Sequence, residues 1–244
     1  MTEANLPSDH PEAPANAAQT ADERVSPGHG DADDARLHRL ARLIGASPHN
    51  LVARGERDHV FARHIAESRA LAETLTPTGR WLDLGTGGGL PGLVLAVWYP
   101  DTRWTLLDAT AKKIAEVARF AETLGLSNVV ALQGRAEQRA HEPAHRGAYD
   151  GVVARAVAPL ATLAELARGF VGDGGLIVAV KGPGWRQELD DAGAALQRLQ
   201  LTVVSTVQLP GGVRESWVVT MRAHGTPPQS FPRRDGLPKH DPLH

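Results

Sequence analysis

The sequence predicts an α/β fold: a mostly parallel sheet that ends in an antiparallel hairpin and is preceded by short helices. After Gly79, short apolar runs alternate with amphipathic runs of helical spacing, and this alternation is typical of a parallel sheet covered by helices on both faces. The last two apolar runs, at 201–209 and 215–222, are separated only by the letters PGGVR. A connection this short joins antiparallel strands, so we expect a hairpin at one edge of the sheet.

The individual elements follow the spacing of apolar side chains. Residues 33–46 (DDARLHRLARLIGA) and 55–75 (GERDHVFARHIAESRALAETL) repeat such side chains at helical intervals. Beyond Gly79, strand-like runs occupy 80–84, 103–108, 128–132, 149–155, 174–182, 201–209 and 215–222. Helical patterns fill most of the gaps between these strands, at 90–99, 111–125, 159–170 and 184–199.

Composition limits the class of protein. The chain has 244 residues, of which 42% are hydrophobic, and it contains no Cys. This length suits one domain of ordinary size plus appendages, and the lack of Cys excludes disulfides, thiolate metal sites and a thiol nucleophile. No apolar run approaches the ~18 residues of a membrane span, and the N-terminus lacks the basic and apolar regions of a secretory signal. We therefore expect a cytoplasmic protein without a membrane partner.

Charge is distributed unevenly along the chain. Residues 1–36 carry eight acidic side chains and two Arg, which leaves 20 acidic and 24 basic groups in the other 208 residues. The basic groups are nearly all Arg, a residue suited to bidentate contact with phosphate. We divide the chain into a disordered acidic tail (1–33), N-terminal helices (34–78), a ligand-binding α/β domain (79–223) and a basic C-terminal tail (224–244).

Polar residues gather where the predicted parallel strands end. Asp83, Asp108, the stretch 135–137, Arg155 and Lys181 each follow an apolar run. Ligands of parallel α/β sheets bind beyond the carboxyl ends of the strands. These residues are therefore candidates for the binding site.

The stretch WLDLGTGGGLPG, Trp81 to Gly92, predicts a strand, a glycine loop and a helix. A dinucleotide fingerprint G-x-G-x-x-G should start where the strand ends, but counting from Gly85 its third glycine position is Leu90. A P-loop would need Gly-Lys-Ser/Thr, which does not follow. Asp83 would oppose a pyrophosphate electrostatically and suits the cationic S-adenosylmethionine. These observations favour S-adenosylmethionine and leave a nicotinamide dinucleotide as the alternative.

Two further features bear on the ligand. Asp108 ends the next strand, where a carboxylate can accept both ribose hydroxyls of either cofactor. The letters HEPAH, His141 to His145, fit a zinc motif that works only on a helix. Pro143 in its middle favours a loop, and we therefore expect no metal.

Five motifs follow one another along the chain: DLGTGGGLPGLVLA, TLLDATAKK, GRAEQ, YDGVVARAVAPL and VAVKG. In sequence and order they resemble one bacterial enzyme family, the small-subunit ribosomal RNA guanine-N7 methyltransferases, also known as the glucose-inhibited division protein B group. The resemblance covers about residues 49–242, including Asn50-Leu51 and Arg63-His64 near the start and FPRRDGLPKHDPL near the end.

The resemblance implies a Rossmann-like, class I methyltransferase fold that uses S-adenosylmethionine to methylate N7 of a guanine in the decoding region of 16S rRNA. The expected partner is 16S rRNA within a small-subunit particle, and the protein is expected to act as a monomer. The cofactor-binding candidates, from the loop analysis and the resemblance together, are Asp83, Gly85, Gly87, Leu90, Asp108, Ala136, Glu137 and Arg155. The RNA-binding candidates are Arg63, His64, Arg135, Arg233, Arg234 and Lys239.

The implied chemistry needs no general base, because guanine N7 carries a lone pair and no proton. Arg155 and Lys181, at neighbouring strand ends, are the candidates for holding the guanine or its phosphate. Three other functions remain open. They are a class I methyltransferase acting on a small molecule or protein, a nicotinamide-dependent dehydrogenase, and a non-catalytic RNA-binding module.

Overall fold

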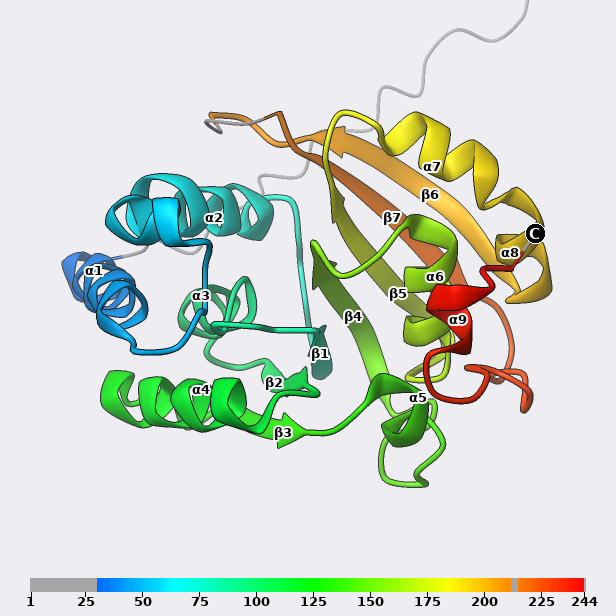
Figure 1. Ribbon diagram of the computed structural model, residues 1–244, viewed down its shortest axis with the longest axis horizontal. Helices are drawn as coiled ribbons and strands as arrows, with labels where there is room; N and C mark the ends of the chain where they lie inside the picture. Colours follow the sequence, from blue (N-terminus) through cyan, green and yellow to red (C-terminus); the bar gives the residue numbers. More distant parts are fainter. Residues whose placement is uncertain (1–29, 212–214, 244) are drawn as a thin grey trace, which may run out of the picture.

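The computed structural model of the protein describes residues 30–211 and 215–243 and contains a seven-stranded sheet (Figure 1). The strand order is β3-β2-β1-β4-β5-β7-β6. The first five strands are parallel, and β7 is antiparallel to both of its neighbours. The expected fold class and its C-terminal hairpin are therefore confirmed. The strands are β1 (Arg80–Leu84), β2 (Arg103–Asp108), β3 (Val129–Gln133), β4 (Tyr149–Arg155), β5 (Val171–Lys181), β6 (Leu201–Gln208) and β7 (Trp217–Ala223).

Helices cover both faces of the sheet and enclose two hydrophobic cores. On one face lie α1 (Asp31–Ala46), the 3-10 helix η1 (Arg54–His59), the π-helix η2 (Val60–Ile65), α2 (Ala66–Ala72), α3 (Gly92–Trp98) and α4 (Ala111–Leu124). The other helices are α5 (Ala136–Arg139), α6 (Leu160–Arg168), α7 (Trp185–Asp191), α8 (Gly193–Arg198) and α9 (Leu237–His240). Of the helices in the described ranges, none is both long and apolar enough to cross a membrane.

The N-terminal helices begin earlier and are less regular than the sequence pattern suggests. Helix α1 starts at Asp31, so the expected boundary after residue 33 is three residues late. Three acidic side chains fall in its first turn, where they interact favourably with the helix dipole. The helix expected at 55–75 consists of η1, η2 and α2 in succession. Residues 1–29 of the expected acidic tail lie outside the described residues.

Residues 224–243, expected as a basic tail, pack against the α/β domain. The guanidinium of Arg168 is fully buried and donates to the carbonyl oxygens of His224 and Gly225, at 2.9 Å each. Arg146 donates to the carbonyl oxygens of Pro227 and Pro228. Because a buried guanidinium must have its donors satisfied, these contacts fix the path of the segment along the domain.

Arg233 completes this attachment. Its backbone N–H, Nε and one terminal nitrogen donate to the carboxylate of Glu165, at 2.8–2.9 Å, and Glu165 has 0% of its surface exposed. Arg233 also reaches Asp241. Arg233 was predicted to bind RNA, but the buried carboxylate, 68 residues earlier in the chain, holds its Nε and one terminal nitrogen, which makes this role less favoured.

This contact predicts a large difference between two adjacent arginines. Arg233→Ala should lower the free energy of unfolding by roughly 3–5 kcal/mol, since it leaves Glu165 charged and buried without its partner. Arg234→Ala changes an exposed neighbour and should alter stability by less than about 0.5 kcal/mol. Urea denaturation of both variants measures the difference, and equal stabilities would contradict the assignment.

Candidate functional site

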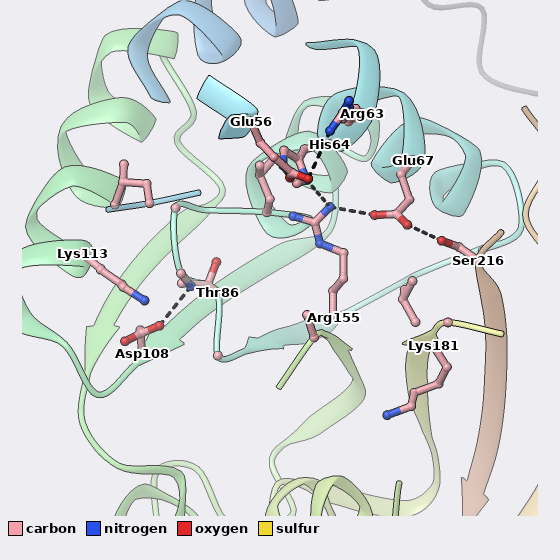
Figure 2. A pocket seen from close by; sticks show the side chains of 18 of the residues that line it. Glu56, Arg63, His64, Glu67, Thr86, Asp108, Lys113, Arg155, Lys181 and Ser216 are labelled. Carbon is pink, nitrogen blue, oxygen red and sulfur yellow. Dashed lines mark hydrogen bonds and ion pairs between the residues drawn. The ribbon is translucent and has the colours of Figure 1, made fainter. Parts of the chain in front are cut away.

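A cavity of about 670 Å³ lies at the carboxyl ends of β1, β2, β4 and β5 (Figure 2). Side chains of η1, η2 and α2 form its roof. Its ionisable lining residues, besides His64, are five acids and four bases: Glu56, Glu67, Asp108, Glu188 and Glu215 against Arg63, Lys113, Arg155 and Lys181. A site with this balance is not built to attract a strongly anionic ligand.

Asp83 supports the glycine loop from below and does not line the cavity. Its side chain is 1% exposed, and Oδ2 accepts hydrogen bonds from Thr86 Oγ1 at 2.5 Å and from the Gly92 N–H at 2.9 Å. Burial raises the pKa of the Asp83 carboxyl to about 6. The expectation that Asp83 contacts the cofactor is thus replaced by a role in holding the loop and the start of α3.

Gly92 shows why this contact requires a glycine. A Cβ at that position would lie 2.6 Å from Asp83 Oδ2 and 2.8 Å from Leu106 Cγ. Any side chain would therefore push α3 away from β1 and β2.

Apart from that of Gly88, the backbone N–H groups between Gly85 and Gly92 are already used within the protein. Gly85 and Thr86 donate to Leu107 O, Gly87 donates to Asp108 Oδ2, and Gly92 donates to Asp83. Gly89 and Leu90 donate to Thr86 O. Dinucleotide and P-loop sites bind phosphate oxygens through such N–H groups. Only the Gly88 N–H is left for a phosphate, fewer donors than a pyrophosphate site uses, and this disfavours the nicotinamide alternative.

Asp108 lies at the floor of the cavity and has a fixed orientation. Oδ2 accepts from the Gly87 N–H at 3.0 Å and Oδ1 accepts from the Thr110 N–H at 2.8 Å. Gly87 has a φ of +56°, and a Cβ there would meet nothing closer than 4.0 Å. The loop is thus left open beside a carboxylate whose remaining lone pairs can accept hydroxyl groups.

Arg155 connects the sheet to the roof. It ends β4, and its terminal nitrogen donates to Glu67 Oε2 at 2.8 Å. The other oxygen of Glu67 accepts from Ser216 Oγ at 2.5 Å. Figure 2 shows Arg155 between Asp108 on one side and Lys181 on the other. Ala156 follows with a φ of +55°, an unfavourable conformation for a residue with a Cβ, and it also lines the cavity.

His64 lies in the roof, on the π-helix η2, a type of turn that is frequent at functional sites. Its Nε2 is 2.6 Å from Glu56 Oε2, and its Nδ1 is 3.4 Å from a terminal nitrogen of Arg155. Burial and the nearby Arg155 lower the pKa of His64. Because Arg155 can only donate, we assign the neutral tautomer with the proton on Nε2.

Lys181 and Glu188 form an ion pair at the other side of the cavity. The Lys181 Nζ is 2.5 Å from Glu188 Oε2 and donates to Ala158 O at 2.8 Å. Glu188 Oε2 also accepts from the Leu160 N–H at the first turn of α6. The predicted candidate Lys181 therefore reaches the cavity together with a carboxylate.

The remaining predicted residues divide into two groups. Gly85, Gly87, Leu90, Asp108, Arg155, Lys181, Arg63 and His64 line the cavity, whereas Ala136, Glu137, Arg135, Arg234 and Lys239 do not. Glu137 Oε1 accepts from the Gly236 N–H at 2.9 Å and from Arg135 at 2.7 Å. Its side chain thus holds the C-terminal segment beside the loop that follows β3.

The HEPAH stretch lies in turns, as expected. His141 Nε2 is 2.8 Å from Pro232 O and His145 Nδ1 is 2.7 Å from the Tyr149 hydroxyl. These partners hold the two rings separately. Over the described ranges, no cluster of His, Asp or Glu has the arrangement of a metal site.

Sequence comparison identifies the family that carries this site. The family described as "rRNA small subunit methyltransferase G" matches residues 37–217. The chain belongs to this family. Curated relatives named "Ribosomal RNA small subunit methyltransferase G" include one from Deinococcus radiodurans, 40% identical over 86% of this chain and 84% of the relative. Another, from Thermotoga neapolitana, is 36% identical over 81% of this chain and 86% of the relative. The resemblance noted from the motifs is confirmed.

Solved structures with a similar fold agree with this family assignment. The fibrillarin pre-rRNA processing protein of Methanococcus jannaschii superposes with a TM-score of 0.53 at 13% identity, over 66% of this chain and 76% of that one. An Agrobacterium tumefaciens protein described as a predicted O-methyltransferase gives 0.52 at 17% identity, over 66% and 83%. At these identities the likeness concerns the fold, and it confirms the expected class I methyltransferase architecture.

Sequence patterns did not indicate four cavity residues of this family member. Glu56, Glu67, Glu188 and Ser216 come from η1, α2, α7 and the residue before β7. Only the predicted helix at 55–75 gave an indication. Glu56, Arg63 and Glu67 follow one another at intervals of seven and four residues, a spacing that places their side chains on one face of a helix.

The buried carboxylate predicts a pH-dependent stability. Asp83 has a folded-state pKa of about 6, above its ordinary value near 3.9. Between these values the folded state binds more protons than the unfolded state, so this group lowers stability as pH rises. Asp83→Asn removes the effect while keeping an oxygen that can accept the same hydrogen bonds. Relative to wild type, the variant should therefore gain roughly 2 kcal/mol between pH 4.5 and pH 7.

Urea titrations of both proteins at the two pH values measure this gain. A difference in stability that does not change with pH would mean that Asp83 titrates normally in the folded protein.

Proposed function

We propose that the protein transfers a methyl group from S-adenosylmethionine to N7 of a guanine in the decoding region of 16S rRNA, within a small-subunit particle. The observation that carries the proposal is the glycine loop, most of whose N–H groups form hydrogen bonds within the protein. The loop lies beside the carboxylate of Asp108, which lines the cavity, in a chain of the rRNA small subunit methyltransferase G family. Such a loop accepts a phosphate-free, cationic cofactor.

The residues at the ends of β1 and β2 fit this cofactor. When bound, S-adenosylmethionine supplies an electrophilic methyl group on a positively charged sulfur. Asp108 would accept the ribose hydroxyls, and the backbone of Gly85 and Gly87 would allow close approach. Leu90 would contribute an apolar wall, and Ala136, the first residue of α5 just outside the cavity lining, would border the adenine. Arg155, held by Glu67, would close the site from the direction of β4.

The residues of the cavity also fit a reaction that removes no proton from its target. Among the residues that the structure describes, His64 is the only histidine that lines the cavity, and its two ring nitrogens contact Glu56 and Arg155. Since N7 of guanine attacks with a lone pair, positioning is the main requirement. Holding two reactants in line can lower a barrier by ~7–11 kcal/mol. Arg155 and Lys181 are the proposed substrate-positioning residues.

The proposed RNA contacts are reduced from six to four. Arg63, at the cavity, and Arg135, Arg234 and Lys239, around the C-terminal segment, carry exposed or half-exposed cationic groups that can bind phosphate. Arg233 is held by Glu165, and His64 is occupied inside the roof.

Asp108 should determine cofactor affinity. Asp108→Asn keeps one acceptor oxygen but removes the charge that strengthens hydrogen bonds from ribose, so we expect about 10-fold weaker binding of S-adenosylhomocysteine. Isothermal calorimetry measures the Kd. Asp101→Asn, at an exposed turn before β2, is the charge-matched control and should bind as wild type does. Wild-type affinity in Asp108→Asn would remove Asp108 from the cofactor site.

The product can be identified in the cell. We expect 7-methylguanosine to disappear from one position of 16S rRNA in a strain that lacks this protein, and to return when the gene is restored. Mass spectrometry of rRNA fragments measures the modified nucleoside and its position. An unchanged set of 7-methylguanosines in the deletion strain would refute the proposed function.

A further inference from the structure

The cavity has two halves, set by the order of the strands. One half lies at the ends of β1 and β2, with the glycine loop, Asp108 and Lys113. The other lies at the ends of β4 and β5 and at α7, with Lys181 and Glu188. Arg155 stands between the two halves (Figure 2). If the cofactor occupies the first half, the second half is left for the base that receives the methyl group.

Lys181 has one hydrogen-bond donor left for a ligand. An ammonium group carries three N–H bonds, and two of them are accounted for by Ala158 O and Glu188 Oε2. Its side chain is 9% exposed, yet it lines the cavity. Among the described residues no third acceptor contacts it, so the remaining N–H can serve a ligand.

Glu188 has a complementary acceptor left. Its Oε2 accepts from Lys181 and from the Leu160 N–H, whereas its Oε1 has no partner among the described residues. The side chain is 32% exposed and lines the same cavity. The pair therefore offers one donor and one charged acceptor side by side.

The start of α7 holds this pair in place. Trp185, the first residue of α7, is buried and packs against Trp217 with ring centroids 5.0 Å apart. The guanidinium of Arg186 lies 4.6 Å from the Trp185 ring. Glu188 lies about one turn further along the helix. The packing of Trp185 therefore fixes the position of the Glu188 backbone near the end of β5.

The pattern of this pair matches guanine. The Watson–Crick edge of guanine presents the O6 acceptor next to the N1–H donor, whereas adenine presents a donor next to an acceptor. Proteins that act on single bases read this edge by hydrogen bonds. A phosphate is a poor ligand here, because Glu188 would repel it at short range.

We propose that Lys181 and Glu188 together recognise the Watson–Crick edge of the target guanine. Lys181 Nζ donates to O6, and Glu188 Oε1 accepts from N1–H. These contacts leave the lone pair of N7 unblocked. The proposal rests on the proposed function, since it assumes that the target base is guanine.

The first test separates base recognition from cofactor binding. Glu188→Gln keeps the size of the side chain and an oxygen that can accept from Leu160, but it removes the charge that the N1–H would meet. With small-subunit particles from the deletion strain as substrate, kcat/KM should fall on the order of 10- to 100-fold. The Kd for S-adenosylhomocysteine should stay unchanged. Asp190→Asn makes the same charge change at an exposed position of α7 and is the matched control.

The second test separates recognition from a merely structural role of the ion pair, such as holding the start of α6. The target guanosine is replaced in a synthetic rRNA by 2,6-diaminopurine, which keeps N7 but presents a donor next to an acceptor. The wild type should methylate guanosine at least 10-fold faster than diaminopurine. In Glu188→Gln this ratio should shrink, because an amide can serve either pattern at N1, while Lys181 still favours O6 over an amino group.

The outcomes distinguish this inference from the proposed function. If the wild type forms no 7-methylguanosine on the particles, both the function and the inference are wrong. If the wild type forms it but Glu188→Gln matches Asp190→Asn in rate, or both proteins share the same base ratio, only the recognition by Lys181 and Glu188 is wrong.

Discussion

The buried carboxylate of Asp83 is the contact on which the site depends. One oxygen accepts from Thr86 and from Gly92, and it thereby ties the end of β1 to both ends of the glycine loop. Burying this carboxylate is costly, as its raised pKa shows. The result is a loop whose N–H groups turn inward and whose open side faces Asp108. Asp83 thus shapes the loop from beneath, outside the residues that line the cavity.

The features that sequence patterns predicted well are those encoded locally. Apolar runs ending at Asp83, Asp108, Arg155 and Lys181 become parallel strands, and parallel strands bring their carboxyl ends to one edge. The positions of these four residues therefore required only the strand pattern and the sheet topology. The register of the loop, beginning at Gly85, was likewise readable, because a strand must end before a glycine turn can start.

The side-chain roles that could not be predicted depend on tertiary contacts with residues distant in the sequence. Composition made Arg233 a candidate for RNA contact, yet its donors are taken by Glu165 in a distant helix. Glu188 gave no sign of its role, and Glu67 showed only that it shares a helical face with Arg63, since the role of a carboxylate on a helix depends on the groups it contacts. A sequence motif records which residue types are present at a strand end. It does not show which oppositely charged side chains from other elements contact those residues in the folded protein.

The order of the strands divides the cavity into two halves. The chain moves outward from β1 through β2 to β3 and then returns to place β4 on the other side of β1. Connections on the two sides of this switch point leave a crevice between them, and Arg155 stands within it. Its partner Glu67 belongs to the roof and also bonds Ser216 next to β7. The guanidinium of Arg155 thus joins the end of β4 to the roof and, through Glu67, to Ser216 beside the hairpin. The relative position of the two halves therefore depends on side chains from three separate parts of the chain.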